Sequence, residues 1–172
     1  FRRAGARGGE RARSARRWAS GIALLVFAMV LTGGFVAGIR AGFAYNTFPL
    51  MNGSVVPPEI LMIEPWWRNF FWNMATVQFD HRLGAWILAI VVPVAWWKVR
   101  AAGISPRAGL GATLLLAMLA VQIVLGIATL VNVVPLTLAA AHQAGAVLVF
   151  ALALATAHAT RRAGAELPNR SG

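Results

Sequence analysis

The chain has 172 residues, of which 59% are hydrophobic and only 12% charged, and it carries a formal net charge of +11. A soluble domain carries roughly twice this charged fraction, so the composition excludes an ordinary soluble fold. There is no cysteine, which excludes disulfides, thiolate ligands and iron–sulfur clusters. Because the first residue is Phe1 and not Met, we interpret the chain as a piece of a longer protein.

Four apolar stretches are long enough to cross a membrane, which takes about 20 residues of helix. The predicted spans cover residues 18–42, 74–97, 108–131 and 135–160. No Asp, Glu, Lys or Arg occurs between Arg107 and Arg161, so the last two spans form an antiparallel pair joined by the short turn 132–135. Since a lipid-exposed backbone must satisfy its own hydrogen bonds, we expect every span to be helical. The sequence therefore predicts an all-α integral membrane protein, built as an antiparallel four-helix transmembrane bundle.

The distribution of basic residues predicts the orientation of the bundle. All but three of the 16 Lys and Arg lie before the first predicted span, between the second and third, or after the fourth. The positive-inside rule therefore places both termini in the cytoplasm. We expect a multi-pass protein of the bacterial inner membrane. We expect residues 1–17 to form an Arg-rich cytoplasmic segment, residues 18–160 the bundle with an outer loop at 43–73, and residues 161–172 a cytoplasmic tail. The net charge is thus a signal of topology. We expect membrane lipid as a partner and no nucleic acid, because no nucleic-acid-binding pattern accompanies the charge.

Two histidines near the outer ends of predicted spans share a pattern, HRLGA from His81 and HQAGA from His142. In each, Gly follows at +3 and Ala at +4, on the helical face that carries the imidazole. We interpret this face as a flat surface against which a macrocycle can lie. The two helices run in the same direction with both imidazoles at similar depth, an arrangement that suits a haem iron held from both sides. The alternative, an imidazole that only hydrogen-bonds to a neighbouring helix, stays open.

Two further residues are considered for the same site. His158 follows His142 by 16 residues, or roughly 24 Å along one helix, so it cannot bind the same iron. Arg82 follows the first histidine and is predicted to bind a haem propionate, because propionates are anionic and seek Arg. The alternative partner of Arg82 is a carboxylate, Asp80 or Glu64.

Polar and small residues inside the spans are interpreted mainly as packing elements. We expect Gln122 and Gln143 to hydrogen-bond between helices rather than to contact a ligand. Several glycines are expected to permit close approach of helices, and some of them to make room for a porphyrin. These glycines are Gly33, Gly34, Gly38, Gly109, Gly111 and Gly126.

Three long motifs resemble the C-terminal half of the haem A synthase family, in the cysteine-free variety of proteobacteria and mitochondria. The motifs are GFAYNTFPLMNG from Gly42, NFFWNMATVQFDHRLGA from Asn69 and QIVLGIATLVNVVPLTLAAAHQAGA from Gln122. The resemblance extends over about residues 33–157. The chain departs from the family pattern at Asp80, where Asn is expected, and at Arg40, where an acidic residue is usual. Neither departure affects the two histidines.

The resemblance implies an eight-span protein made of two similar four-helix bundles, of which this chain is the C-terminal one. It implies that His81 and His142 are the axial ligands of a haem b cofactor, so that the iron has bis-histidine ligation. The N-terminal bundle would hold the substrate, haem O, and a functional Glu, so the catalytic residues would lie in a half that this chain lacks. The family oxidises a ring methyl of haem O to a formyl group by successive hydroxylations, which gives haem A for cytochrome oxidase. Haem O synthase is a candidate partner.

Three functions compete on the sequence alone. The leading one is the cofactor half of haem A synthase, a haem-dependent membrane oxidoreductase that is inactive as this fragment alone. The alternative is a bis-histidine membrane b-type cytochrome that acts only in electron transfer. The third is a cofactor-free scaffold in cytochrome oxidase assembly, and a haem spectrum would distinguish it from the other two.

Overall fold

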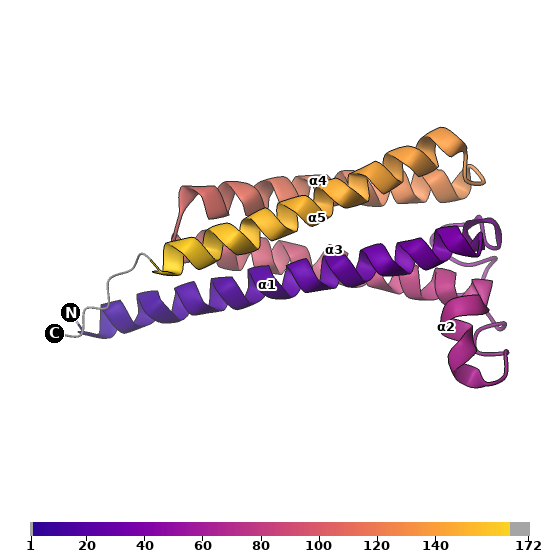
Figure 1. The fold of residues 1–172 in the computed structure, drawn as a ribbon, viewed down its shortest axis with the longest axis horizontal. Coiled ribbons are helices and arrows are strands. Elements are labelled where there is room, and N and C mark those ends of the chain that lie inside the picture. Colours follow the sequence, from indigo (N-terminus) through magenta and orange to yellow (C-terminus); the bar gives the residue numbers. More distant parts are fainter. Residues whose placement is uncertain (1, 166–172) are drawn as a thin grey trace.

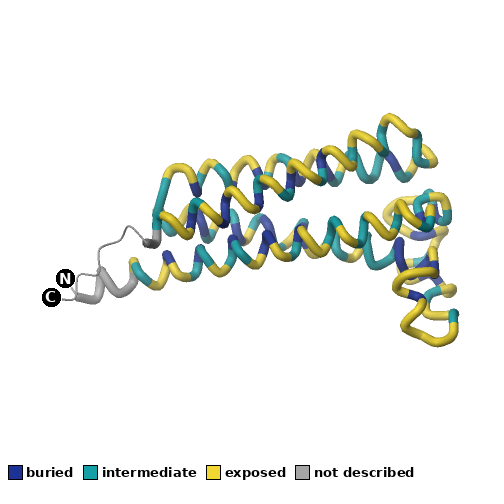
Figure 2. The backbone as a smooth tube through the Cα atoms, viewed as in Figure 1, coloured by how far each residue is buried: buried dark blue, intermediate teal, exposed yellow. Residues whose placement is uncertain are grey.

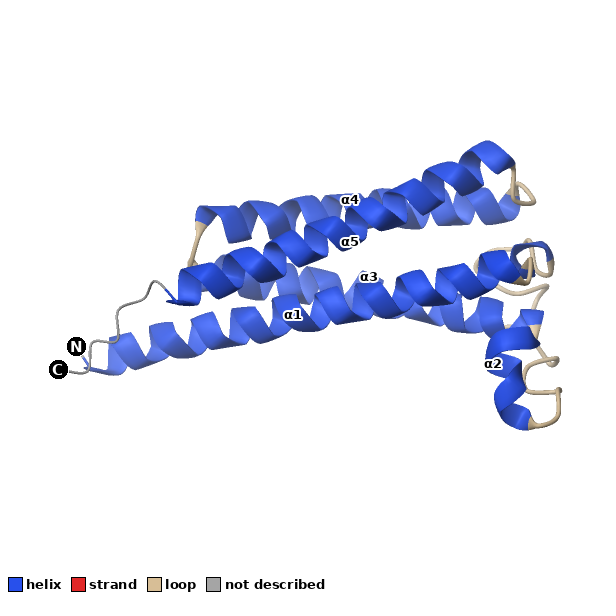
Figure 3. Cartoon of the chain, in the orientation of Figure 1, coloured by secondary structure: helices blue, strands red, loops and turns tan. Residues whose placement is uncertain are grey.

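The computed structural model describes residues 2–165, and the side chains of residues 8–163. Its elements, all helical, are α1 (Arg2–Gly38), η1 (Ala41–Phe43), η2 (Trp66–Arg68), α2 (Asn69–Trp72), α3 (Met74–Ala102), α4 (Pro106–Val131) and α5 (Leu136–Ala165) (Figure 3). Four of these helices, α1, α3, α4 and α5, are long and apolar enough to cross a membrane. The predicted all-α membrane bundle is confirmed, and the protein is a multi-pass membrane protein.

The four long helices form two antiparallel hairpins that pack side by side (Figure 1). In one hairpin α1 packs along α3, and in the other α4 packs along α5. The hairpins meet through contacts of α1 with α5 and of α3 with α4. We call the end where α1 begins and α5 ends the terminal end, and the opposite end, with residues 39–73 and the turn 132–135, the loop end. Both α3 and α5 start at the loop end, so they run in the same direction.

The helix boundaries differ from the predicted spans at both ends of the chain. The Arg-rich residues continue α1 instead of forming a separate segment, because Arg and Ala both favour helix and no proline interrupts them. α1 ends at Gly38 and not at residue 42, since Arg40 adopts a left-handed conformation with φ of 57°. Of the predicted tail, residues 161–165 extend α5 and residues 166–172 lie outside the described residues. The division into cytoplasmic segment, bundle and cytoplasmic tail stays a prediction.

The start of α3 is fixed by its capping residue. The side-chain oxygen of Asn73 accepts hydrogen bonds from the backbone N–H of Ala75 at 2.9 Å and of Thr76 at 3.3 Å. Such a cap satisfies N–H groups that have no partner inside the helix. Because the cap sets where α3 begins, it also sets the depth at which His81 lies.

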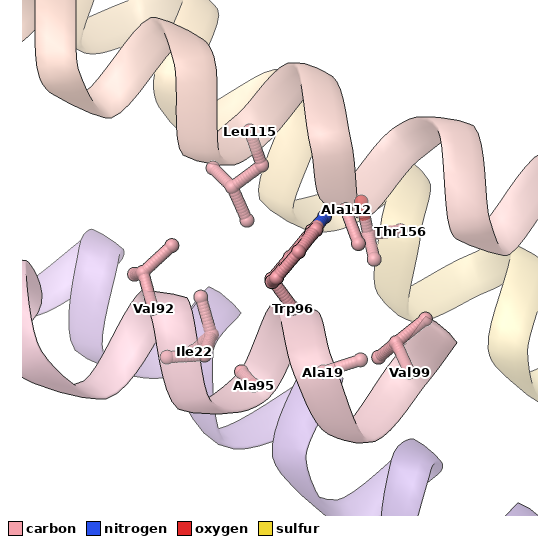
Figure 4. Close-up of a pocket in the computed structure, with 9 residues that line it drawn as sticks. All are labelled: Ala19, Ile22, Val92, Ala95, Trp96, Val99, Ala112, Leu115 and Thr156. Atoms are coloured by element: carbon pink, nitrogen blue, oxygen red, sulfur yellow. The ribbon is translucent and has the colours of Figure 1, made fainter. Parts of the chain in front are cut away.

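The hydrophobic core fills the half of the bundle nearer the terminal end (Figure 2). Its buried residues nearest the loop end come from all four long helices and are Val26, Leu88, Leu119 and Val149. A small cavity within this core is lined by residues of all four helices, among them Ala19, Trp96, Ala112 and Thr156 (Figure 4). Its volume is about 10 Å³, room for about one water molecule. This cavity is therefore too small for a large ligand.

Candidate functional site

His81 and His142 lie at matching depths below the loop end. His81 is seven positions after Met74, the first residue of α3, and His142 is six positions after Leu136, the first residue of α5. At 1.5 Å per residue both are roughly 9–10 Å from the starts of their helices. Each is also seven positions before a residue of the last core layer, Leu88 in α3 and Val149 in α5. The structure thus brings the predicted pair to one level, which we call the histidine layer.

The side chains of three helices around the histidine layer are more exposed than those of the core on one side of it. Among the described side chains, none is buried in residues 27–38 of α1, 79–87 of α3 or 136–144 of α5, whereas α4 has Gln122 and Thr129 buried here. Both imidazoles are themselves half-buried. The histidine layer is therefore more open to its surroundings on these three helices than the close-packed core is.

Each imidazole packs on a glycine of the other helix of its own hairpin. A Cβ atom added at Gly33 of α1 would lie 3.2 Å from Cε1 of His81. A Cβ atom added at Gly126 of α4 would lie 2.8 Å from Cε1 and 3.4 Å from Nδ1 of His142. Side chains at either position would push the ring away, so these glycines set the positions of the two rings. The hairpins repeat one arrangement, with the imidazole of the second helix lying on a glycine of the first.

The glycines three positions after the histidines do not form bare surfaces. A Cβ atom at Gly84 would lie 2.8 Å from Sδ of Met29, and one at Gly145 would collide with the side-chain oxygen of Gln122. Both glycines face the neighbouring helix of their own hairpin, because the histidine and the residue at +3 share a helical face. Our interpretation of the Gly and Ala face as a flat surface for a macrocycle is therefore wrong. Its small residues admit a side chain of the partner helix.

The ring nitrogens of the two histidines have different surroundings. Nδ1 of His81 lies 2.9 Å from Oγ1 of Thr32, whereas Nδ1 of His142 is buried without a hydrogen-bond partner. Neither Nε2 atom is hydrogen-bonded to a described residue, and neither is fully buried. Each ring therefore keeps one nitrogen available as a ligand.

This donor set fits a haem iron better than an ion held by side chains alone. No group of three or more His, Asp or Glu that could hold a metal occurs among the described residues, and a structural zinc site needs about four such ligands. A haem iron takes four ligands from the macrocycle and needs only two from the protein. His81 and His142 are the residues that could supply them.

Arg82 is engaged with the loop that covers the end of α3. Its two terminal nitrogens donate hydrogen bonds to the carbonyl oxygens of Thr47 at 2.9 Å and Tyr45 at 2.9 Å, with longer contacts to Leu50 and Gln78. Its Nε is buried and has no partner. For the predicted propionate, Arg82 therefore has one remaining donor, its Nε. The predicted alternative partners, Asp80 and Glu64, are not among the hydrogen-bond acceptors of Arg82 in the described structure. Its evident structural role is to hold the loop onto α3.

The remaining predicted residues are placed as follows. His158 is exposed and 16 residues further along α5 than His142, away from the histidine layer. Gln122 donates a 2.7 Å hydrogen bond to the carbonyl oxygen of His142, which confirms its role between helices. Gln143 is exposed and has no side-chain hydrogen bond to a described residue. Among the predicted packing glycines, Gly111 lies against Thr156, whereas a Cβ at Gly34, Gly38 or Gly109 would have no neighbour within 4 Å.

Thr32 is the site residue that sequence reasoning missed. A threonine inside an apolar span is common, and its contact with His81 joins positions 49 residues apart in the chain. The available signal was its place directly before Gly33, on the helix that pairs with α3.

Comparison with known proteins agrees with this description. The sequence model of a family described as "Cytochrome oxidase assembly protein", COX15-CtaA, matches residues 2–154. A protein of Nitrosospira multiformis named heme A synthase is 68% identical over 82% of this chain and 40% of its own length. The heme A synthase of Nitrosomonas eutropha is 58% identical over 76% of the chain and 36% of its own length. Heme A synthase COX15 of Arabidopsis thaliana is 44% identical over 82% of the chain and 31% of its own length.

The chain thus spans about 40% or less of the length of these relatives. No solved structure matches it. The resemblance to the haem A synthase family is confirmed by the family match and by the high identity of these relatives. The chain belongs to the COX15-CtaA family of cytochrome oxidase assembly proteins.

Proposed function

We propose that this chain is the haem-binding half of a haem A synthase, the oxidoreductase that converts haem O to haem A by successive hydroxylation of a ring methyl to a formyl group. The observation that carries the proposal is the histidine layer. His81 and His142 come from different hairpins, lie at one depth and each keep an unpaired Nε2. The names and lengths of the relatives support it. Each is named heme A synthase, and the chain matches less than half of the length of each.

In this proposal His81 and His142 would hold a haem b through its iron. The bound haem supplies an iron that alternates between two oxidation states and so carries single electrons. Gly33 and Gly126 position the two imidazoles. Arg82 holds the loop over the start of α3, which limits the access of water from the loop end. The substrate haem O, its catalytic residues and a partner such as haem O synthase are assigned to the remainder of the enzyme.

The same proposal assigns the chain to the bacterial inner membrane. The terminal end would face the cytoplasm, because all but three of the Lys and Arg lie in segments at that end or directly next to them. The histidine layer would then lie in the outer half of the membrane.

The test is a reduced-minus-oxidised absorbance spectrum of the purified chain after haem b is added. We expect a b-type signal from the wild-type chain, and we expect His81→Ala and His142→Ala each to lose most of it, because one remaining imidazole leaves the iron without its second ligand. His158→Ala is the matched control and should keep the signal, because His158 is exposed and roughly 24 Å away along α5.

Two results would contradict the proposal. A wild-type chain without b-type absorbance would exclude a haem site. Equal signals from His81→Ala and wild type, in variants that keep the helical circular dichroism of the parent, would exclude ligation by His81.

A further inference from the structure

Thr32 links His81 to the backbone of α1. Its hydroxyl oxygen lies 2.8 Å from the carbonyl oxygen of Met29 and 2.9 Å from Nδ1 of His81. A hydroxyl group has one proton to donate and two lone pairs with which to accept. The carbonyl oxygen of Met29 has no proton, so the hydroxyl must donate its proton there for a 2.8 Å contact to be attractive. The hydroxyl oxygen is then the acceptor toward His81, and Nδ1 of His81 carries the proton.

The protonation of Nδ1 determines what the other ring nitrogen can do. In a neutral imidazole one nitrogen carries the proton and the other has a lone pair. With the proton of His81 on Nδ1, the lone pair is on Nε2, the nitrogen without a protein partner. Two contacts together fix the plane of the ring. Nδ1 is hydrogen-bonded to Thr32, and Cε1 of the same ring lies against Gly33. Hydrogen bonds to the second nitrogen of ligating histidines commonly fix tautomer and orientation in this way.

We propose that Thr32 is a positioning residue, which holds His81 in the tautomer and orientation required for binding iron through Nε2. The proposal rests on the proposed function, because it assigns His81 a metal to bind. It adds a residue that does not touch the iron itself and acts through the imidazole alone.

The second hairpin provides a comparison within the same chain. Gly126 is the counterpart of Gly33, so Leu125 occupies the place that Thr32 has in α1. A leucine side chain cannot accept a hydrogen bond, and Nδ1 of His142 is buried without a partner. Nothing described therefore selects the tautomer of His142 as Thr32 does for His81. Leu125→Thr would supply the missing acceptor.

The first experiment measures haem b affinity in Thr32→Val and Thr32→Ser. Valine keeps the shape of threonine without the hydroxyl, and serine keeps the hydroxyl. We expect Thr32→Val to weaken haem binding by about 10–100-fold, the usual cost of losing such a partner, and to change the low-spin electron paramagnetic resonance signal. Thr32→Ser should stay close to wild type. Leu125→Thr should bind haem at least as tightly as wild type.

The second experiment needs no haem and separates this inference from the proposed function. Nitrogen-15 NMR of the histidine-labelled chain reports which ring nitrogen carries the proton. We expect the Nδ1–H form of His81 in wild type and Thr32→Ser, and a mixture of tautomers in Thr32→Val. If wild type binds no haem but shows this pattern, the proposed function fails and the tautomer assignment holds.

The inference would be overturned by an Nε2–H tautomer of His81 in the wild-type chain. It would also be overturned if Thr32→Val bound haem as tightly as wild type. Should Thr32→Val fail to fold, the wild-type tautomer and the Leu125→Thr variant still decide the question. A tautomer of His142 that does not respond to the new hydroxyl would count against the proposed geometry.

Discussion

Tyr45 shows how single residues hold the loop end together. It is the one tyrosine of the chain, and its hydroxyl donates a 2.6 Å hydrogen bond to Oε2 of Glu59. The ring is buried with Met51 and Ala75 in a small cluster over the start of α3. Burial, and then the hydrogen bond and charge of Glu59, raise the pKa of Tyr45 from 10.0 to about 12. The folded loop therefore holds this proton more tightly than the unfolded chain does.

This difference predicts how the loop responds to alkaline pH. A pKa that is raised on folding stabilises the fold below the unfolded pKa, and the stabilisation is lost as pH rises through the folded pKa. The stabilising contribution of Tyr45 should be complete below about pH 10 and should disappear by about pH 12. Ultraviolet absorbance of tyrosinate, titrated in detergent, should have its midpoint near the higher value.

Glu59→Gln provides the control for this titration. We expect it to lower the midpoint without returning it to 10.0, because burial, the largest cause of the shift, remains. A wild-type midpoint near 10 in the folded chain would show that Tyr45 is neither buried nor paired as described.

At the level of helices, hydropathy and charge were sufficient to predict the main elements. The turn at 132–135 is where the sequence predicted it, and α4 begins within two residues of its predicted start. The relative depth of the two histidines also followed, because it depends only on where α3 and α5 begin and on the rise per residue. The rotation of each helix about its axis did not follow, since that depends on which neighbour it packs against. For this reason the sequence could not show that Met29 and Gln122 cover Gly84 and Gly145.

The two covered glycines predict unequal responses to the same substitution. Gly145→Ala places a methyl group on the side-chain amide of Gln122, which cannot turn away without losing its hydrogen bond to the backbone of His142. Gly84→Ala meets the thioether of Met29, which is the flexible end of its side chain. We expect Gly145→Ala to destabilise the bundle by about 1–3 kcal/mol, as overpacking commonly does, and Gly84→Ala to cost less.

The measurement is unfolding of each variant by sodium dodecyl sulfate in mixed micelles, followed by circular dichroism. Gly109→Ala is the matched control, because a Cβ there has no neighbour within 4 Å and alanine favours helix over glycine. Equal destabilisation by Gly84→Ala and Gly145→Ala would contradict the difference between their neighbours.

Considered as a whole, the molecule places the histidine layer between two regions held by packing and hydrogen bonds. On one side is the close-packed core of the terminal half. On the other, the amide of Asn46 donates hydrogen bonds to the carbonyl oxygens of Gly42 at 2.8 Å and Leu130 at 2.9 Å, which ties the first loop to the second hairpin. His81 and His142 belong to different hairpins. A haem ligated by both would therefore join the hairpins at the histidine layer, in addition to the core and the loop end. Ligand binding of this kind stabilises the folded state, and the stabilisation grows with the logarithm of the ratio of ligand concentration to Kd.

The whole-molecule arrangement also predicts what the chain cannot do by itself. The histidine layer offers two imidazoles, enough for one haem iron, whereas oxidation of haem O in the proposed enzyme requires a cofactor haem and a substrate haem at the same time. We therefore expect the isolated chain to bind haem b and to leave haem O unchanged.

The test is incubation of the haem-loaded chain with haem O, oxygen and a reductant, followed by chromatography of the extracted pigments. The full-length heme A synthase of Nitrosospira multiformis, which is more than twice as long as the matched region, is the control that must yield haem A. Formation of haem A by the isolated chain would show that one bundle accommodates both haems, and the division of labour between two halves would have to be abandoned.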